Sequence, residues 1–159
     1  MIKKEFVTKK GLIKLREELQ KLETLDRHII SKKIAEARDK GDISENSEYN
    51  AVKEAQGLIE MRISRLKEII ANVRIIDSAS IDTTKVSILS TVKIRNITQG
   101  LSQSYTLVPN HESDLSVGKI SINTPIAQGL LGKKVGETTH ISLPNGNKLL
   151  LEIKDIQQL

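Results

Sequence analysis

The sequence predicts an α+β protein in which a helical hairpin precedes a small sheet domain. Apolar residues recur at spacings of three and four up to about residue 74, which is the helical period. After residue 78, short strand-like runs alternate with turn residues. The stretch between them, SASIDTTKVS, is polar and lacks a helical stripe, so we place the boundary there and expect domains at 1–77 and 78–159.

Residues 8–40 are expected to form one long helix. Thr8 can cap its start, and no strong helix breaker follows before Gly41. The apolar stripe consists of Leu12, Leu15, Leu19, Leu22, Leu25, Ile29, Ile30, Ile34 and Ala37. The heptad spacing slips between Leu22 and Leu25, which predicts an imperfect supercoil.

Residues 45–74 are expected to form a second helix of similar length. Its stripe consists of Ala51, Ala55, Leu58, Ile59, Ile63, Leu66, Ile69, Ile70 and Val73. At the standard helical rise each helix is about 45 Å long. The short polar bend between them favours an antiparallel coiled coil within one chain, and the alternative is a coiled coil that dimerises two chains.

The second half is expected to be a sheet packed on one short helix. The residues from Thr124 to Gly132 have a helix cap, then Pro125 at the first helical position, then a glycine just past the end. Pro144–Asn147 is a strong hairpin turn signal. The strand-like runs are Val86–Leu89, Thr91–Ile97, Ser104–Val108, Lys119–Ile122, Thr138–Leu143 and Leu149–Ile156.

Composition excludes several classes of function. With no cysteine, disulfides and thiolate metal sites are absent, and the histidines lack metal-ligand spacing. One Phe, two Tyr and no Trp are too few rings for a base-stacking platform, so with a net charge of +5 any nucleic-acid contact should be to phosphates. No apolar run suits a signal peptide or membrane helix, so we expect a soluble cytoplasmic protein without membrane contact.

The stretch GDISENSEYNAVK carries acidic residues at the bend of the hairpin, and two interpretations of them stay open. Asp42 and Glu45 have the spacing of a capping box for the second helix. Alternatively, the two carboxylates share one Mg²⁺, hold it weakly and leave coordination positions for water and phosphate. At the tip of a rod such a pair could complete a two-metal phosphoryl-transfer site in another protein.

Basic residues gather near the bend. Residues 27–40 contain five basic side chains and two acidic ones. Arg38, Lys40 and, past the bend, Lys53 are candidates for contacts with RNA phosphates. The alternative is a solvated helix face with pairs at i and i+4.

Three motifs together resemble the bacterial Gre transcript cleavage factor family. The first runs from Glu36 to Gly57 and contains Gly41-Asp42, Glu45-Asn46 and Glu48-Tyr49. The second lies near the start, at Thr8, Gly11 and residues 14–19, and the third is ISINTPIAQGLLGKKVGE, residues 120–137. The resemblance covers essentially the whole chain in the same order.

The resemblance implies a mode of action. An FKBP-like C-terminal domain would dock at the rim of the secondary channel of bacterial RNA polymerase, through the segment around Asn123, Thr124 and Pro125. Thr124 stands where the family usually has Ser and keeps the hydroxyl. The coiled coil would enter the channel, where Asp42 and Glu45 help hold a second Mg²⁺. The polymerase would then cleave the 3′ end of its backtracked nascent RNA, so the factor, a monomer, would not be an enzyme by itself.

Three rival functions compete with transcript cleavage. A channel inhibitor would share the architecture and lack cleavage activity, but relatives of that kind change the acids at the tip or the orientation of the domains. A prolyl isomerase would need a largely aromatic pocket, and Tyr105 is the sole aromatic residue after residue 78. A plain coiled-coil adaptor would tolerate neutral substitutions at the tip.

Overall fold

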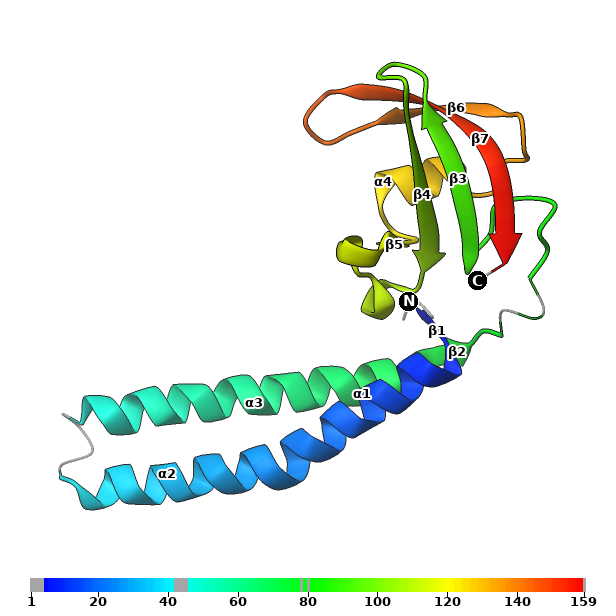
Figure 1. The fold of residues 1–159 in the computed structure, drawn as a ribbon. Coiled ribbons are helices and arrows are strands. Elements are labelled where there is room, and N and C mark those ends of the chain that lie inside the picture. The colour runs from blue at the N-terminus through cyan, green and yellow to red at the C-terminus, as the bar shows by residue number, and fades with distance from the viewer. Residues whose placement is uncertain (1–4, 42–45, 78, 80, 159) are drawn as a thin grey trace. The chain divides into compact units, whose positions relative to one another are not determined.

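The protein has the α+β fold predicted from its sequence, with a helical hairpin followed by a curled sheet (Figure 1). The residues described by the computed structural model are 5–41, 46–77, 79 and 81–158. They form two compact units, one with Glu5 and Lys9–Arg74, the other with Phe6–Thr8 and the chain from Ile75 onwards.

The predicted helical hairpin is confirmed. Its first arm contains α1 (Lys9–Lys21) and α2 (Arg27–Asp39), and its second arm is α3 (Ser47–Asn72). The two arms pack against each other within one chain. The buried apolar side chains of the arms are Leu12, Leu15, Ile30, Ile34, Ala37, Ile63, Leu66 and Ile69.

The long helix predicted over residues 8–40 is present from Lys9 to Asp39, but it is not α-helical throughout, because a π-helical turn, η1 (Leu22–Asp26), separates α1 from α2. Within this turn the Thr24 hydroxyl donates a hydrogen bond to the Gln20 carbonyl at 2.7 Å. A π-turn accommodates one extra residue without ending the helix. It lies where the heptad spacing of the apolar stripe slips.

The extra residue explains which apolar side chains face the partner helix. Leu12, Leu15, Leu19 and Leu22 keep one heptad frame, whereas Ile30, Ile34 and Ala37 keep a frame moved on by one residue. Leu25 fits neither frame, and Ile29 fits only the frame that precedes the π-turn; the two side chains are 51% and 42% exposed. Their assignment to the stripe was therefore wrong, as was that of Leu58 in α3, which is 62% exposed.

A pair of three-residue strands was not predicted. Strand β1 (Glu5–Val7) pairs with β2 (Val73–Ile75), so α3 ends at Asn72 rather than at residue 74. The Ile76 N–H donates to the Val7 carbonyl at 2.8 Å.

Thr8 precedes α1 as predicted, and its hydroxyl donates to the Glu112 carboxylate at 2.5 Å.

The second unit is built on a five-stranded sheet of order β5-β4-β3-β7-β6. All neighbours pair antiparallel except β4 and β5, which are parallel. The register of β3 with β7 shifts between Lys93 and Ile94. The strands are β3 (Ser90–Asn96), β4 (Leu101–Val108), β5 (Lys119–Ser121), β6 (Thr138–Ser142) and β7 (Lys148–Gln158).

The predicted short helix and hairpin turn are both confirmed. Helix α4 (Pro125–Leu130) has Thr124 as its N-cap, and Gly132 has the positive φ of +80° that suits a glycine past a helix end. In the turn between β6 and β7 the Leu143 N–H donates to the Asn147 carbonyl at 2.8 Å. Two 3₁₀ turns, η3 (Asn110–Glu112) and η4 (Leu115–Val117), precede β5.

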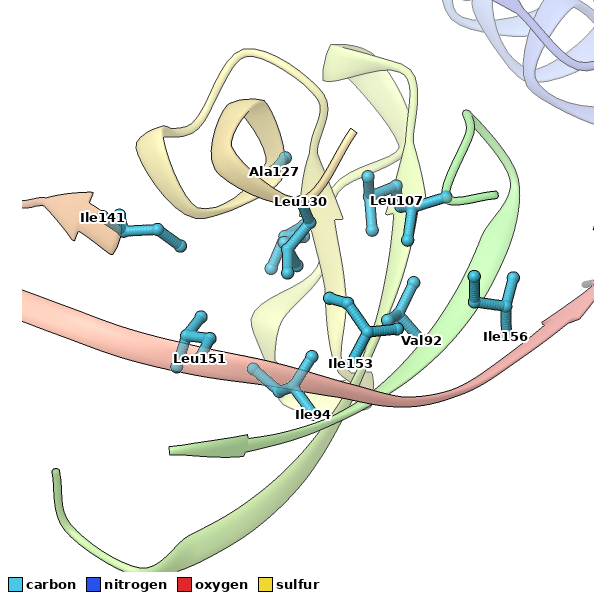
Figure 2. Packing of buried hydrophobic residues seen from close by; sticks show 11 residues of the cluster. Val92, Ile94, Leu107, Ala127, Leu130, Ile141, Leu151, Ile153 and Ile156 are labelled. Carbon is cyan, nitrogen blue, oxygen red and sulfur yellow. The ribbon is translucent and has the colours of Figure 1, made fainter. Parts of the chain in front are cut away.

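Helix α4 packs on the sheet to form the core of this unit (Figure 2). Ala127 and Leu130 of α4 are fully buried and face side chains from β3, β4, β6 and β7. The helix lies so close to β6 that a Cβ at Gly129 would come within 2.7 Å of Cγ1 of Ile141. The core thereby fixes the position of the segment before α4.

The predicted strand at Val86–Leu89 is wrong, because the chain turns there before β3 begins. The segment is apolar because two of its side chains are buried: Val86 and Leu89 are each only 1% exposed. Leu89 has a φ of +69°, a left-handed conformation that costs a non-glycine residue about 1–2 kcal/mol. Burial of a leucine side chain, about 1.5–3 kcal/mol, offsets that strain.

Candidate functional site

The bend of the hairpin is bounded by Gly41, after α2, and by Asn46, before α3. Asp42 and Glu45, the predicted metal ligands, lie outside the described residues. Their donor set fits Mg²⁺ chemically, because the ion prefers carboxylate oxygens and two of them leave its octahedron open to other ligands. Elsewhere, within the described parts of the chain, no three His, Asp or Glu side chains gather as metal ligands would.

Asn46 is the N-cap of α3. Its Oδ1 accepts a hydrogen bond from the Tyr49 N–H at 3.0 Å, and its backbone is extended, with φ −84° and ψ 97°. The capping-box interpretation, in which Asp42 caps this helix, is therefore wrong. The helix starts later than predicted because the amide of Asn46 satisfies an N–H of the first turn.

The Asn46 side chain also contacts the other arm of the hairpin. Its Nδ2 donates to the Ala37 carbonyl at 2.6 Å. That carbonyl lies in the last turn of α2 and also accepts from the Lys40 N–H at 3.3 Å. The last carbonyls of a helix lack intrahelical donors, so Asn46 supplies one of the missing partners.

Of the predicted basic residues, Lys40 is engaged across the bend. Its ammonium group lies 3.1 Å from Oε1 of Glu48 and 3.4 Å from Oε2. Both side chains are more than half exposed, so the ion pair contributes at most about 1 kcal/mol. Competing anions such as phosphate can therefore displace Glu48 at little cost.

Lys53 and Arg38 are both exposed. The Lys53 ammonium donates to Oε1 of Gln56 at 2.9 Å, one helical turn further along α3. Arg38 lies in the last turn of α2 and forms no ion pair with another residue that the structure describes. The structure thus places Arg38 and Lys40 in the same final turns of the first arm.

Ion pairs join the two arms on either side of the π-turn. The Arg27 guanidinium donates to both carboxylate oxygens of Glu60, at 2.8 and 2.9 Å, and this hydrogen bonding lowers the pKa of Glu60. Arg62 makes the same two-point contact with Glu18, at 2.8 and 3.0 Å. These side chains are largely exposed, so the pairs fix the register of the arms more than they stabilise the fold.

The predicted docking segment is a rigid turn between β5 and α4. The Thr124 hydroxyl donates to the Ser121 carbonyl at 2.8 Å and accepts from the Ala127 N–H at 3.3 Å. The Asn123 N–H donates to the Ser121 hydroxyl at 3.1 Å. Asn123 and Pro125 are exposed on this turn, which holds them in fixed positions.

Comparison with known proteins assigns both halves of the chain. Residues 5–75 match the N-terminal domain of transcription elongation factors, and residues 81–158 match the GreA/GreB C-terminal domain. A protein from Christiangramia forsetii named transcription elongation factor GreA is 54% identical over 146 residues, 92% of each chain. The chain belongs to the GreA/GreB family of transcription elongation factors. The resemblance inferred from the three sequence motifs is thereby confirmed.

A second relative agrees with the GreA/GreB assignment. A Flavobacterium johnsoniae protein named transcription elongation factor GreA is 53% identical over 156 residues, 98% of each chain. Solved structures are more distant. GreA factor homolog 1 of Thermus thermophilus is 24% identical, covers 98% of this chain and 99% of its own, and has a TM-score of 0.45. A GreA/GreB factor from Nitrosomonas europaea is 27% identical, covers 66% and 92%, and has a TM-score of 0.42.

The position of the cap in this GreA/GreB chain was missed by sequence reasoning. The bend contains several residues that can cap a helix, among them Asp42, Ser44, Asn46 and Ser47. The capping box favoured the first of them, and spacing alone offered no way to prefer Asn46.

In the part of the chain that the structure describes, no helix is both long and apolar enough to span a membrane.

Proposed function

We propose that this GreA/GreB family member stimulates bacterial RNA polymerase to cleave its own backtracked RNA. The hairpin would enter the secondary channel of the polymerase and bring Asp42 and Glu45 to the active site. The observation that carries the proposal is the hairpin itself, whose 26-residue α3 extends about 39 Å and ends at the segment bearing both acids. The site of action is the cell interior, where transcription occurs.

The two carboxylates would act as ligands of a second Mg²⁺ shared with the polymerase. A second metal ion in a phosphoryl-transfer site orients the attacking water and stabilises the charge that develops on the phosphate. Asp42 and Glu45 would supply negatively charged oxygens and leave the remaining coordination positions to polymerase, RNA and water. In this proposal the chain would lend ligands to the active site of the polymerase.

The basic residues near the bend would face the RNA phosphates. Arg38 supports this role best, because it is exposed at the end of α2 and its guanidinium can bind a phosphate through two hydrogen bonds. Lys40 would exchange its exposed pair with Glu48 for a phosphate contact. Lys53 lies further along α3 and would contact RNA at a greater distance from the acids.

The turn containing Asn123, Thr124 and Pro125 would dock on the polymerase. Its hydrogen bonds hold the exposed side chains in place before binding, and preorganisation of this kind lowers the entropic cost of association. We expect the factor to act as a monomer, because the apolar stripes of its two arms already cover each other within one chain.

The proposal is tested with a stalled, backtracked bacterial elongation complex whose RNA is labelled at its 5′ end. Added factor should shorten the RNA rapidly in the presence of Mg²⁺, and the shortened RNA should be extended again when nucleotides are supplied. Complexes without factor give the intrinsic cleavage rate. A factor that binds the polymerase but leaves this rate unchanged or lowers it would instead be a non-cleaving channel regulator.

Replacing Thr124 by Ala should weaken docking. The substitution removes the cap of α4 and the bond to Ser121, and caps of this kind contribute about 1 kcal/mol. We expect the factor concentration that gives half-maximal cleavage to rise about 5-fold, with the maximal rate preserved. Thr124→Ser should restore the wild-type value, and Thr138→Ala, on the exposed surface of β6, is the matched control. If Thr124→Ala leaves the half-maximal factor concentration unchanged, this turn is not part of the interface with the polymerase.

A further inference from the structure

Asn46 joins the two arms of the hairpin through one side-chain amide. Its Nδ2 donates to the carbonyl of Ala37 in α2, at 2.6 Å, while its Oδ1 accepts from the N–H of Tyr49 in α3, at 3.0 Å. A carbonyl only accepts and an N–H only donates, so a single orientation of the amide satisfies both partners. Asn46 is half-buried and Ala37 is fully buried.

The other polar contact described between the arms at this end is weaker. The Lys40–Glu48 ion pair is exposed, and a pair of that kind adds between nothing and about 1 kcal/mol. The Asn46 bonds are partly shielded from water, where each hydrogen bond contributes about 0.5–1.5 kcal/mol. The amide is therefore the stronger of these two polar contacts at the bend.

The amide also defines where the acidic segment begins and ends. The C-cap of α2 is Lys40, and the N-cap of α3 is Asn46, so only residues 41–45 lie between the two helices. Asp42 and Glu45 belong to this segment, and Glu45 is bonded directly to Asn46. Fixing the ends of so short a segment restricts the positions that its side chains can reach.

We propose that Asn46 is a positioning residue for transcript cleavage. Its amide acts as a staple between the end of α2 and the start of α3, and so fixes both ends of the segment that carries the two proposed Mg²⁺ ligands. This inference rests on the proposed function, because it assigns Asn46 a role in that reaction. Ligand groups must be held within about 0.5 Å of their working geometry, so loss of the staple should impair catalysis and leave polymerase binding intact.

Two substitutions remove the staple and keep the helix cap. Asn46→Asp retains an acceptor for the Tyr49 N–H but has no donor for the Ala37 carbonyl. Asn46→Ser also caps well and is uncharged, but its side chain is too short to bridge the arms. Asp and Ser are as good as Asn at the N-cap, so α3 should remain folded in both variants.

A matched control lies at the opposite end of α3. The Asn72 Nδ2 donates to the Glu68 carbonyl at 2.8 Å, within one arm of the hairpin. Asn72→Asp therefore makes the same chemical change, with the same change of charge and the loss of one amide-to-carbonyl bond. It leaves the bend untouched.

The experiment measures cleavage in backtracked complexes over a range of factor and Mg²⁺ concentrations. For Asn46→Asp and Asn46→Ser we expect a half-saturating factor concentration within about 2-fold of wild type and a maximal rate lower by about 10-fold or more. Raising Mg²⁺ should recover part of the lost rate. A purely structural defect would change the half-saturating concentration instead. Asn72→Asp should match wild type in both quantities.

A second readout needs no polymerase. The sequence contains no cysteine, so spin labels attach only to cysteines that are introduced. We place one by Glu36→Cys in α2 and the other by Asn50→Cys in α3. The distance distribution between the labels should broaden in both Asn46 variants and stay narrow in Asn72→Asp. An unchanged distribution in the Asn46 variants would show that the amide does not fix the arms.

The outcomes separate the two proposals. If the wild type cleaves and the Asn46 variants cleave equally fast at limiting Mg²⁺, the positioning role of Asn46 is overturned and the proposed function stands. If the wild type binds polymerase without stimulating cleavage, the proposed function fails, and the positioning role fails with it. Slow cleavage together with a broadened distance distribution in both variants would establish the positioning role.

Discussion

Replacing Asp42 by Asn is expected to remove most of the transcript cleavage that this protein stimulates, with little effect on its fold. The change exchanges a charged Mg²⁺ ligand for a neutral amide, and we expect the maximal cleavage rate to fall about 100-fold. Helix α3 should be unaffected, because its N-cap is Asn46. Glu45→Gln should act in the same direction. The measurement is RNA shortening at saturating factor.

The control for charge is Asp39→Asn, three residues before Asp42. Asp39 is exposed in the last turn of α2, where a negative charge is not favoured by the helix dipole. This variant should cleave at the wild-type rate and be at least as stable. If the Asp42→Asn variant cleaves at the wild-type rate, the Asp42 carboxylate is not a ligand of Mg²⁺.

Replacing Leu130 by Ala should have the largest effect on stability. Leu130 is fully buried at the centre of the core between α4 and the sheet (Figure 2). Truncation of such a leucine costs about 2–5 kcal/mol, a large part of the stability of a small domain. Urea unfolding followed through NMR signals of β3 and β7 reports on this domain separately from the hairpin.

A matched substitution tests whether burial is the cause. Leu115 is 79% exposed, so Leu115→Ala should change the free energy of unfolding by less than about 0.5 kcal/mol. Equal destabilisation by the two variants would contradict the assignment of the core. Unfolding of this domain should also raise the factor concentration needed for cleavage, because the proposed docking turn is held by α4.

The parts of the fold that could be predicted from sequence are those with a repeated local signal. The apolar stripes were enough to identify both arms of the hairpin because their period extends over many turns. Helix α4 could be bounded because Thr124, Pro125 and Gly132 each mark one end of a helix. The turn between β6 and β7 was similarly marked by its proline, asparagines and glycine.

Features without such a signal were missed or misassigned. Strands β1 and β2 have three residues each, too few to show an alternating pattern. Val86–Leu89 looked like a strand because Val86 and Leu89 are apolar and buried, although the segment belongs to no strand of the sheet. The slip of the heptad frame was visible, but a π-turn and a loosely wound coil give the same slip. At the bend, the choice of Asn46 over Asp42 depends on Ala37, a contact between the arms that no local pattern contains.

The π-turn in the first arm bears on how the reach of such a hairpin can change in evolution. In a regular coiled coil, added residues must come as whole heptads, about 10 Å at a time, to keep the apolar seam aligned. The turn at Leu22–Asp26 shows another route, since one extra residue is absorbed while Leu15 before it and Ile30 after it both remain buried. Residues can thus be added to an arm one at a time and not only in sevens. If the hairpin acts as proposed and must meet an active site in a channel, a local irregularity in its helix would give it a fine adjustment.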